Sequence, residues 1–151
     1  MRYFVLLLAI LLGTALRTLS AQSNTQALSR SHAPVSSKEK ASVESAVQFL
    51  LTSAAADFHA HGPSGPLRFR RVRIGHVMGP NAVKQYRLCG QFMRIQQGVK
   101  SRWSPFVTIK TSGVEQYVGT QAADFCKDSS VIWDNAGDLS SLLQSRFDKL
   151  R

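Results

Sequence analysis

Acidic residues are missing from the middle of this 151-residue chain. Between Phe58 and Val114 there is no Asp or Glu, yet the same span holds ten basic residues: Arg68, Arg70, Arg71, Arg73, Lys84, Arg87, Arg94, Lys100, Arg102 and Lys110. The acids lie in the flanking segments, so the positive charge of this span is not neutralised locally. Such one-signed charge bears on partners and solubility and not on the fold.

Motifs for several kinds of chemistry are also missing. There is no G-x-S-x-G sequence, and the few carboxylates are dispersed, which argues against a serine hydrolase or a paired-carboxylate glycosidase. The two cysteines, Cys89 and Cys126, lack the close C-x-x-C spacing of a thiol or metal site. We therefore expect no cofactor and no metal.

The one long apolar run lies at the start of the chain. Arg2 precedes the apolar segment Phe4–Leu12, and Leu19-Ser20-Ala21 offers a cleavage site, as in a secretory signal peptide. The alternative is an uncleaved anchor, but a spanning helix needs about 20 apolar residues. We predict a signal peptide over residues 1–21, a flexible lead over residues 22–35, and export to the periplasm or the medium.

Residues 36–151 predict a single α+β domain. Ser36 and Glu39 form a capping-box pattern. Apolar residues then recur at helical spacing: Val43, Val47, Leu50, Leu51, Ala54 and Phe58. Four strands with short connections are predicted over Leu67–Val77, Val83–Ile95, Trp103–Ile109 and Val114–Val118. An N-terminal helix packed on a four-stranded antiparallel meander accounts for both patterns.

The C-terminal part predicts a short helical tail. Thr120–Lys127 is expected to form one short helix. Asp138 is placed to cap a last helix with one apolar face made of Leu139, Leu142, Leu143, Phe147 and Leu150.

The two cysteines predict a disulfide. In an oxidising compartment, Cys89 and Cys126 most simply pair with each other, whereas a reactive or metal-binding pair is the alternative. Closing this loop of 37 residues would stabilise the fold by about 4 kcal/mol. Gly90 has no side chain, so we expect it to leave room for another segment to approach the sheet closely there.

Three short blocks resemble a group of small exported proteobacterial proteins of unknown function. The blocks are Tyr86–Phe92, Trp103–Val107 and Val118–Lys127. The resemblance covers residues 86–127 and implies export and a disulfide, but no activity. The segment Phe92–Ile95 departs from the Asn-Ala-Lys run that often follows Cys-Gly in that group. One helix before a four-stranded meander also resembles the cystatin arrangement as a fold analogy, without the Q-x-V-x-G sequence that cystatins use.

Four arginines near the start of the first strand are the candidate anion-binding residues: Arg68, Arg70, Arg71 and Arg73. A β-bulge at Arg70-Arg71 would place Leu67, Phe69, Val72 and Ile74 on the core face and direct the arginines outward. The planar guanidinium group suits phosphate or carboxylate. A merely solvated, soluble face is the competing interpretation.

The expected partner is therefore an anionic lipid, lipopolysaccharide, an acidic glycan or an acidic protein. Nucleic acid is set aside because an exported protein meets little of it. In addition, the aromatic residues among the basic ones are better explained as core: Tyr86, Phe92, Trp103 and Phe106.

The histidines offer a second hypothesis. His59, His61 and His76 could serve general acid–base chemistry in a small ribonuclease-like hydrolase, or bind a metal ion. However, His59 and His61 lie where the first helix ends, and a histidine in a last helical turn is already favoured by the helix dipole. The sequence thus favours a non-enzymatic binding module over this alternative, and leaves the oligomeric state open.

Overall fold

The computed structural model describes residues 37–151, which belong to one compact unit. The predicted signal peptide and lead lie outside the described residues. The elements in order are α1 (Ser37–His61), β1 (Leu67–Met78), the 3₁₀ turn η1 (Pro80–Ala82), β2 (Lys84–Gln96), β3 (Val99–Lys100), β4 (Ser104–Lys110), β5 (Val114–Val118), α2 (Thr120–Lys127), β6 (Ile132–Trp133) and α3 (Ser140–Asp148). The predicted α+β class, with a helix on an antiparallel sheet, is confirmed.

Helix α1 forms the first layer. It ends at His61, directly before a Gly- and Pro-rich loop that cannot continue a helix. Its buried residues follow the predicted stripe: Ala46, Val47, Leu50, Leu51, Ala54, Ala55 and Phe58. Glu39, in the first turn, accepts a hydrogen bond from the amine of Lys84 at 2.6 Å. Among residues 37–151, no helix is long and apolar enough to cross a membrane.

The sheet contains the predicted meander. Strands β1, β2, β4 and β5 are antiparallel neighbours, and the full order is β5-β4-β2-β1-β6, with β3 paired to β2. The short strands β3 and β6 were not predicted, because two residues carry no alternating pattern. The predicted strand bounds agree with the observed ones to within one or two residues.

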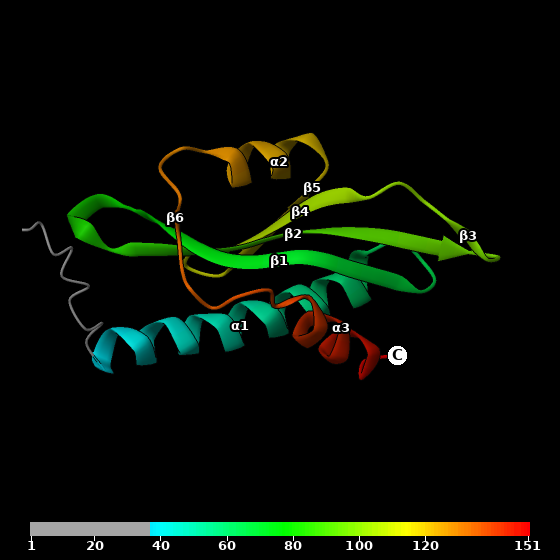
Figure 1. Ribbon diagram of the computed structural model, residues 1–151, viewed down its shortest axis with the longest axis horizontal. Coiled ribbons are helices and arrows are strands. Elements are labelled where there is room, and N and C mark those ends of the chain that lie inside the picture. The colour runs from blue at the N-terminus through cyan, green and yellow to red at the C-terminus, as the bar shows by residue number, and fades with distance from the viewer. Residues whose placement is uncertain (1–36) are drawn as a thin grey trace, which may run out of the picture. The chain divides into compact units, whose positions relative to one another are not determined.

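The sheet is covered on both faces (Figure 1). We call the face that packs on α1 and α3 the inner face, and the face on which α2 lies the outer face. The inner face forms the main core, in which Phe58 contacts the rings of Phe69, Phe92 and Phe106 at 4.9–5.1 Å between centroids. The outer face carries a smaller cluster: Cys89, Val107, Ile109 and Ala122, with Tyr117, Phe125, Cys126 and Trp133 packed against it.

The predicted bulge in β1 is present. Arg70 pairs with Gln91 and Arg73 with Cys89, so Arg71 and Val72 together face one residue of β2. Arg71 takes a positive φ of 53°, a conformation that non-glycine residues seldom adopt. As a result, the four apolar residues of β1 are buried on the inner face: Leu67, Phe69, Val72 and Ile74.

The edge of β1 that does not pair with β2 is covered by the start of α3 and by β6. The backbone N–H of Val72 donates to the Ser140 hydroxyl at 3.1 Å, and the N–H of Leu139 donates to the Val72 carbonyl at 2.8 Å. Strand β6 pairs with Gly75 and His76 further along. These bonds satisfy groups that a bulged edge strand would otherwise leave free. Because α3 docks along this edge, Leu139, Leu143 and Phe147 are buried, but Leu142 and Leu150 are exposed, which corrects the predicted apolar face.

The predicted disulfide joins Cys89 to Cys126 with 5.9 Å between the Cα atoms, inside the range that a disulfide permits. The close approach expected at Gly90 is made by side chains of the neighbouring strands β4 and β1. A side chain at Gly90 would come within 2.7 Å of the Phe106 ring and 2.9 Å of Val72, so Gly90 admits an inner-face aromatic ring. Because side chains alternate along a strand, Gly90 and Cys89 serve opposite faces.

Candidate anion-binding site

The predicted arginines lie together on the outer face. Arg68, Arg70 and Arg73 oppose Met93, Gln91 and Cys89, which are alternate residues of β2. Because of the bulge, Arg73 faces the same side of the sheet as Arg68 and Arg70. The three β2 residues that they oppose are two residues apart, so the spacing along the strand is about 7 Å, twice the rise per residue. We call Arg68, Arg70, Arg71 and Arg73 the arginine row; Arg70 is half-buried and the other three are exposed.

Two arginines of the row are stacked on tryptophans. The guanidinium carbon of Arg70 lies 4.1 Å from the centroid of the Trp103 ring, and that of Arg73 lies 4.2 Å from Trp133. Arg70 also donates through Nε to the Gln91 amide oxygen at 2.9 Å. Stacking fixes the plane of a guanidinium and leaves N–H groups at its edge for an anion. Trp103 is half-buried under Arg70 and is not the core residue that the sequence suggested.

No carboxylate pairs with the arginine row among residues 37–151. The ion pairs in this part of the chain join Asp57 to His61, Asp134 to His76, and Glu39 to Lys84. The charge excess seen in the sequence is therefore not removed by folding in the described region.

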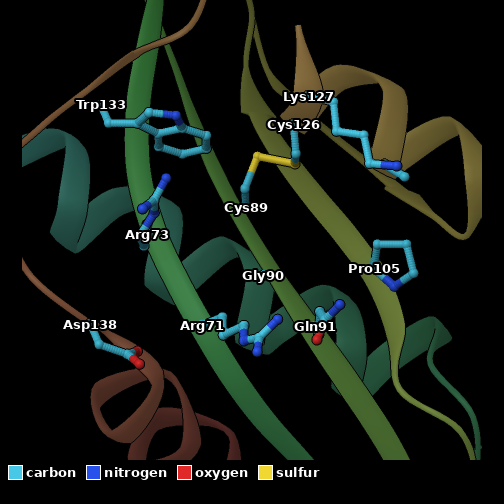
Figure 2. Close-up of a pocket in the computed structure, with 11 residues that line it drawn as sticks. Arg71, Arg73, Cys89, Gly90, Gln91, Pro105, Cys126, Lys127, Trp133 and Asp138 are labelled. Carbon is cyan, nitrogen blue, oxygen red and sulfur yellow. A yellow bond between two sulfur atoms is a disulfide. The ribbon is translucent and has the colours of Figure 1, made fainter.

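A cleft of about 500 Å³ opens beside the row on the outer face (Figure 2). Its lining comes from five elements and the segment before α3: Arg71, Arg73, Cys89, Gly90, Gln91, Pro105, Ala123, Cys126, Lys127, Trp133 and Asp138. In Figure 2, Arg73 points toward Trp133, Arg71 extends from β1 toward Gln91, and Lys127 stands on the α2 side. Three cations and one carboxylate thus surround a floor made of strand backbone and the disulfide.

The carboxylate of Asp138 is held by the protein itself. It accepts hydrogen bonds from the hydroxyl and, at 2.9 Å, the backbone N–H of Ser140. The Ser140 hydroxyl, and after it the N–H groups of Ser140, Val72 and Arg71, lower the pKa of Asp138. Asp138 therefore remains a carboxylate at neutral pH and connects the start of α3 to the bulge.

Helix α2, one wall of the cleft, is fixed to the sheet by a buried arginine as well as by the disulfide. Arg87 is 4% exposed, and its Nη1 donates to the carbonyl of Phe125 at 2.8 Å. That carbonyl belongs to the last turn of α2, where carbonyls lack helical partners and a cation is favoured. Burial lowers the pKa of Arg87, while the nearby Asp128 acts in the opposite direction. Arg87 therefore positions the wall and does not face a ligand.

The structure does not bring the three candidate histidines together. His59 and His61 are exposed at the C-terminal end of α1. His76 is buried near the other end of that helix, where its ring neighbour Tyr86 approaches Ser42. From Ser42 to His59, α1 rises by roughly 25 Å. His76 contacts Asp134 at 3.3 Å and so ties the segment after β6 to β1. The described residues include no group of three or more His, Cys, Asp or Glu that could hold a metal ion.

Several residues of the cleft were missed by sequence reasoning. Lys127 was placed on the correct helix but given no role, and Trp133 was left unassigned in the tail. Gln91 and Asp138 were likewise not expected near the arginines. The disulfide was the available signal, since it predicts that residues next to Cys126 lie near β2.

Comparisons with known proteins assign no family to the chain. No family model matches it, and no curated protein or solved structure matches it significantly. The resemblance of residues 86–127 to exported proteobacterial proteins, and the fold analogy with cystatins, therefore stay predictions.

Proposed function

We propose that this protein is an exported, non-enzymatic binding module that holds an anionic partner on the outer face of its sheet. The observation that carries the proposal is the arginine row, four arginines on one strand with no carboxylate paired to them in the described region. Export rests on the predicted signal peptide over residues 1–21.

The stacked arginines favour binding over mere solvation. A solubilising surface needs charge but no fixed side chains, and long flexible cations serve it well. In contrast, the guanidinium groups of Arg70 and Arg73 each lie over a tryptophan ring, at 4.1 and 4.2 Å from its centroid. Fixing them in advance reduces the side-chain entropy that would be lost when an anion binds. The arrangement therefore supports a built recognition surface.

The partner is expected among the anions of the cell envelope or its surroundings: anionic lipid, lipopolysaccharide, an acidic glycan or an acidic protein. Each presents phosphate or carboxylate groups that arginine can bind with two parallel hydrogen bonds. No observation favours the alternative hydrolase, because His76 is far from His59 and His61.

The test compares binding to anionic and neutral lipid vesicles by sedimentation. The variant changes all four arginines of the row to Ala. A matched control changes four other basic residues to Ala: Arg94, Lys100, Arg102 and Lys110. Each variant loses four positive charges, so non-specific attraction falls equally in both. A lysine or arginine near an anionic surface contributes about 1 kcal/mol. We expect the row variant to lose at least tenfold more affinity than the control.

High salt provides the second criterion. At about 1 M salt the screening length falls to roughly 3 Å, so attraction by exposed charges should largely vanish. Binding that survives both the row substitutions and high salt, or binding that does not distinguish anionic from neutral vesicles, would reject the proposal.

A further inference from the structure

The cleft beside the arginine row has a different composition from the row itself. The row is an open line of charge, whereas the cleft combines two of its arginines with Lys127 from α2. Against these three cations stands Asp138, whose carboxylate is already bonded to Ser140. The lining therefore has an excess of two positive charges.

An excess of two charges selects among anions. A carboxylate or a phosphodiester carries one negative charge and would leave one cation uncompensated. A phosphate monoester carries about −1.5 to −2 at neutral pH and three strong acceptor oxygens. Cations from two sides of the cleft, Arg71 and Arg73 on β1 and Lys127 on α2, suit such a tetrahedral group.

The remaining walls suit the body that carries the phosphate. The disulfide, Pro105 and Ala123 offer apolar surface, and Trp133 adds an aromatic side chain to the lining. Gln91 adds one amide whose oxygen is already used by Arg70. A volume of about 500 Å³ lies in the range of small-molecule sites.

We infer that this cleft is a binding site for a phosphate monoester group attached to a compact, partly apolar body. The same chemistry occurs in the headgroup of a lipid phosphomonoester and in a soluble organic phosphate. This inference rests on the proposed function, because Arg71 and Arg73 take part in both. Lys127, however, belongs to the cleft alone.

The first experiment titrates the unmodified protein with phenyl phosphate, benzoate and inorganic phosphate by calorimetry and by NMR. Phenyl phosphate should bind at least tenfold more tightly than benzoate, which has the same ring and one charge less. It should also bind more tightly than inorganic phosphate, because the ring contacts the apolar walls. The shifted NMR signals should be those of Gly90, Gln91 and the Trp133 indole.

The pH dependence tests the charge argument. The second ionisation of a phosphate monoester has a pKa near 6, so at about pH 5 only about one tenth is dianionic. No histidine lines the cleft, so between about pH 5 and pH 7.5 the titrating group is the ligand. Affinity for phenyl phosphate should fall about tenfold over this range, and that for benzoate should change little.

Variants locate the site. Arg73→Ala should weaken phenyl phosphate binding at least tenfold, and Lys127→Ala at least threefold. Lys100→Ala removes the same charge as Lys127→Ala at an exposed position away from the cleft, and should stay within twofold of the unmodified protein. Lys127 is exposed, so its removal should not impair folding.

Vesicles distinguish the two sources of the ligand. If a lipid headgroup is the ligand, vesicles with phosphatidic acid should bind better than vesicles with phosphatidylglycerol at equal content, and phenyl phosphate should compete. If a soluble phosphate is the ligand, phenyl phosphate should bind while the two vesicles are equivalent.

The inference is overturned if phenyl phosphate binds no better than benzoate, or if Lys127→Ala behaves like Lys100→Ala. Row-dependent binding to anionic vesicles in that case would leave the proposed function in place. Conversely, loss of vesicle binding with retained phenyl phosphate binding would reject the row and keep the cleft.

Discussion

Gly75 is the residue whose substitution should most directly connect the packing of the sheet to the cleft. It lies in β1 opposite Trp133 of β6. A Cβ atom placed on Gly75 would be 2.9 Å from the backbone oxygen of Ile132, from Cε3 of Trp133 and from Cγ1 of Val131. The backbone oxygen cannot rotate away, so Gly75→Ala must displace β6.

The expected cost follows from overpacking. Inserting a methyl group into a well-packed contact typically costs 1–3 kcal/mol, that is, a factor of roughly 5 to 150 in the unfolding equilibrium. Equilibrium unfolding in urea measures this directly. The displacement should also move the Trp133 ring away from Arg73, so we expect phenyl phosphate affinity to fall at least threefold.

Gly113→Ala is the matched control. An added Cβ at Gly113 would meet no atom within 4 Å, so stability and affinity should stay close to those of the unmodified protein. The reasoning is refuted if the free energy of unfolding of Gly75→Ala differs from that of the unmodified protein by less than about 0.5 kcal/mol and if the variant binds phenyl phosphate equally well. That result would mean that β6 moves freely and does not define the cleft.

Two further predictions concern the ties that hold the C-terminal part. Changing both Cys89 and Cys126 to Ala should lower the free energy of unfolding by about 4 kcal/mol, because the bridge closes a 37-residue loop; a loss below about 1 kcal/mol in urea unfolding would contradict this. Asp138→Asn keeps an acceptor oxygen but removes the negative charge near the start of α3, so it should cost about 0.3–1 kcal/mol at neutral pH, a modest figure because the side chain is exposed and screened. Since folding lowers the pKa of Asp138, its contribution is present above the usual aspartate pKa of about 3.9 and disappears as the pH falls through the folded value. The difference between the two proteins should therefore vanish at about pH 2, and a difference that persists there would disprove the assignment.

The arginine row shows how far local patterns lead. Leu67 and Phe69 share one parity and Val72 and Ile74 the other, so a bulge is the simplest way to bury all four. The bulge alone then predicts the arginine row, because the arginines occupy the positions of this strand that do not face the core. The strand contains this information within eight residues, and no distant contact is needed to extract it.

The cleft shows where such patterns stop. Trp133 reaches Arg73 only because β6 crosses Gly75, and Asp138 reaches the bulge only because α3 docks along the edge of β1. Neither tryptophan nor aspartate carries a periodic signal in these segments, and the path of the chain between α2 and α3 is set by contacts made across the whole sheet.

Gly90 illustrates the same division at a single residue. The sequence shows that a small residue stands beside Cys89, and the alternation of side chains places the two on opposite faces. Which neighbour fills the space left by Gly90 is decided by packing, and the Phe106 ring from β4 occupies it. From its sequence alone this protein thus specifies its helix, its meander, its disulfide and the direction of its arginines, since each depends on local periodicity or on the two cysteines present. The packing of α2 on the outer face and the cleft beside the arginine row could be found only in the tertiary structure. Residues distant in sequence meet there through long-range packing that no local pattern records.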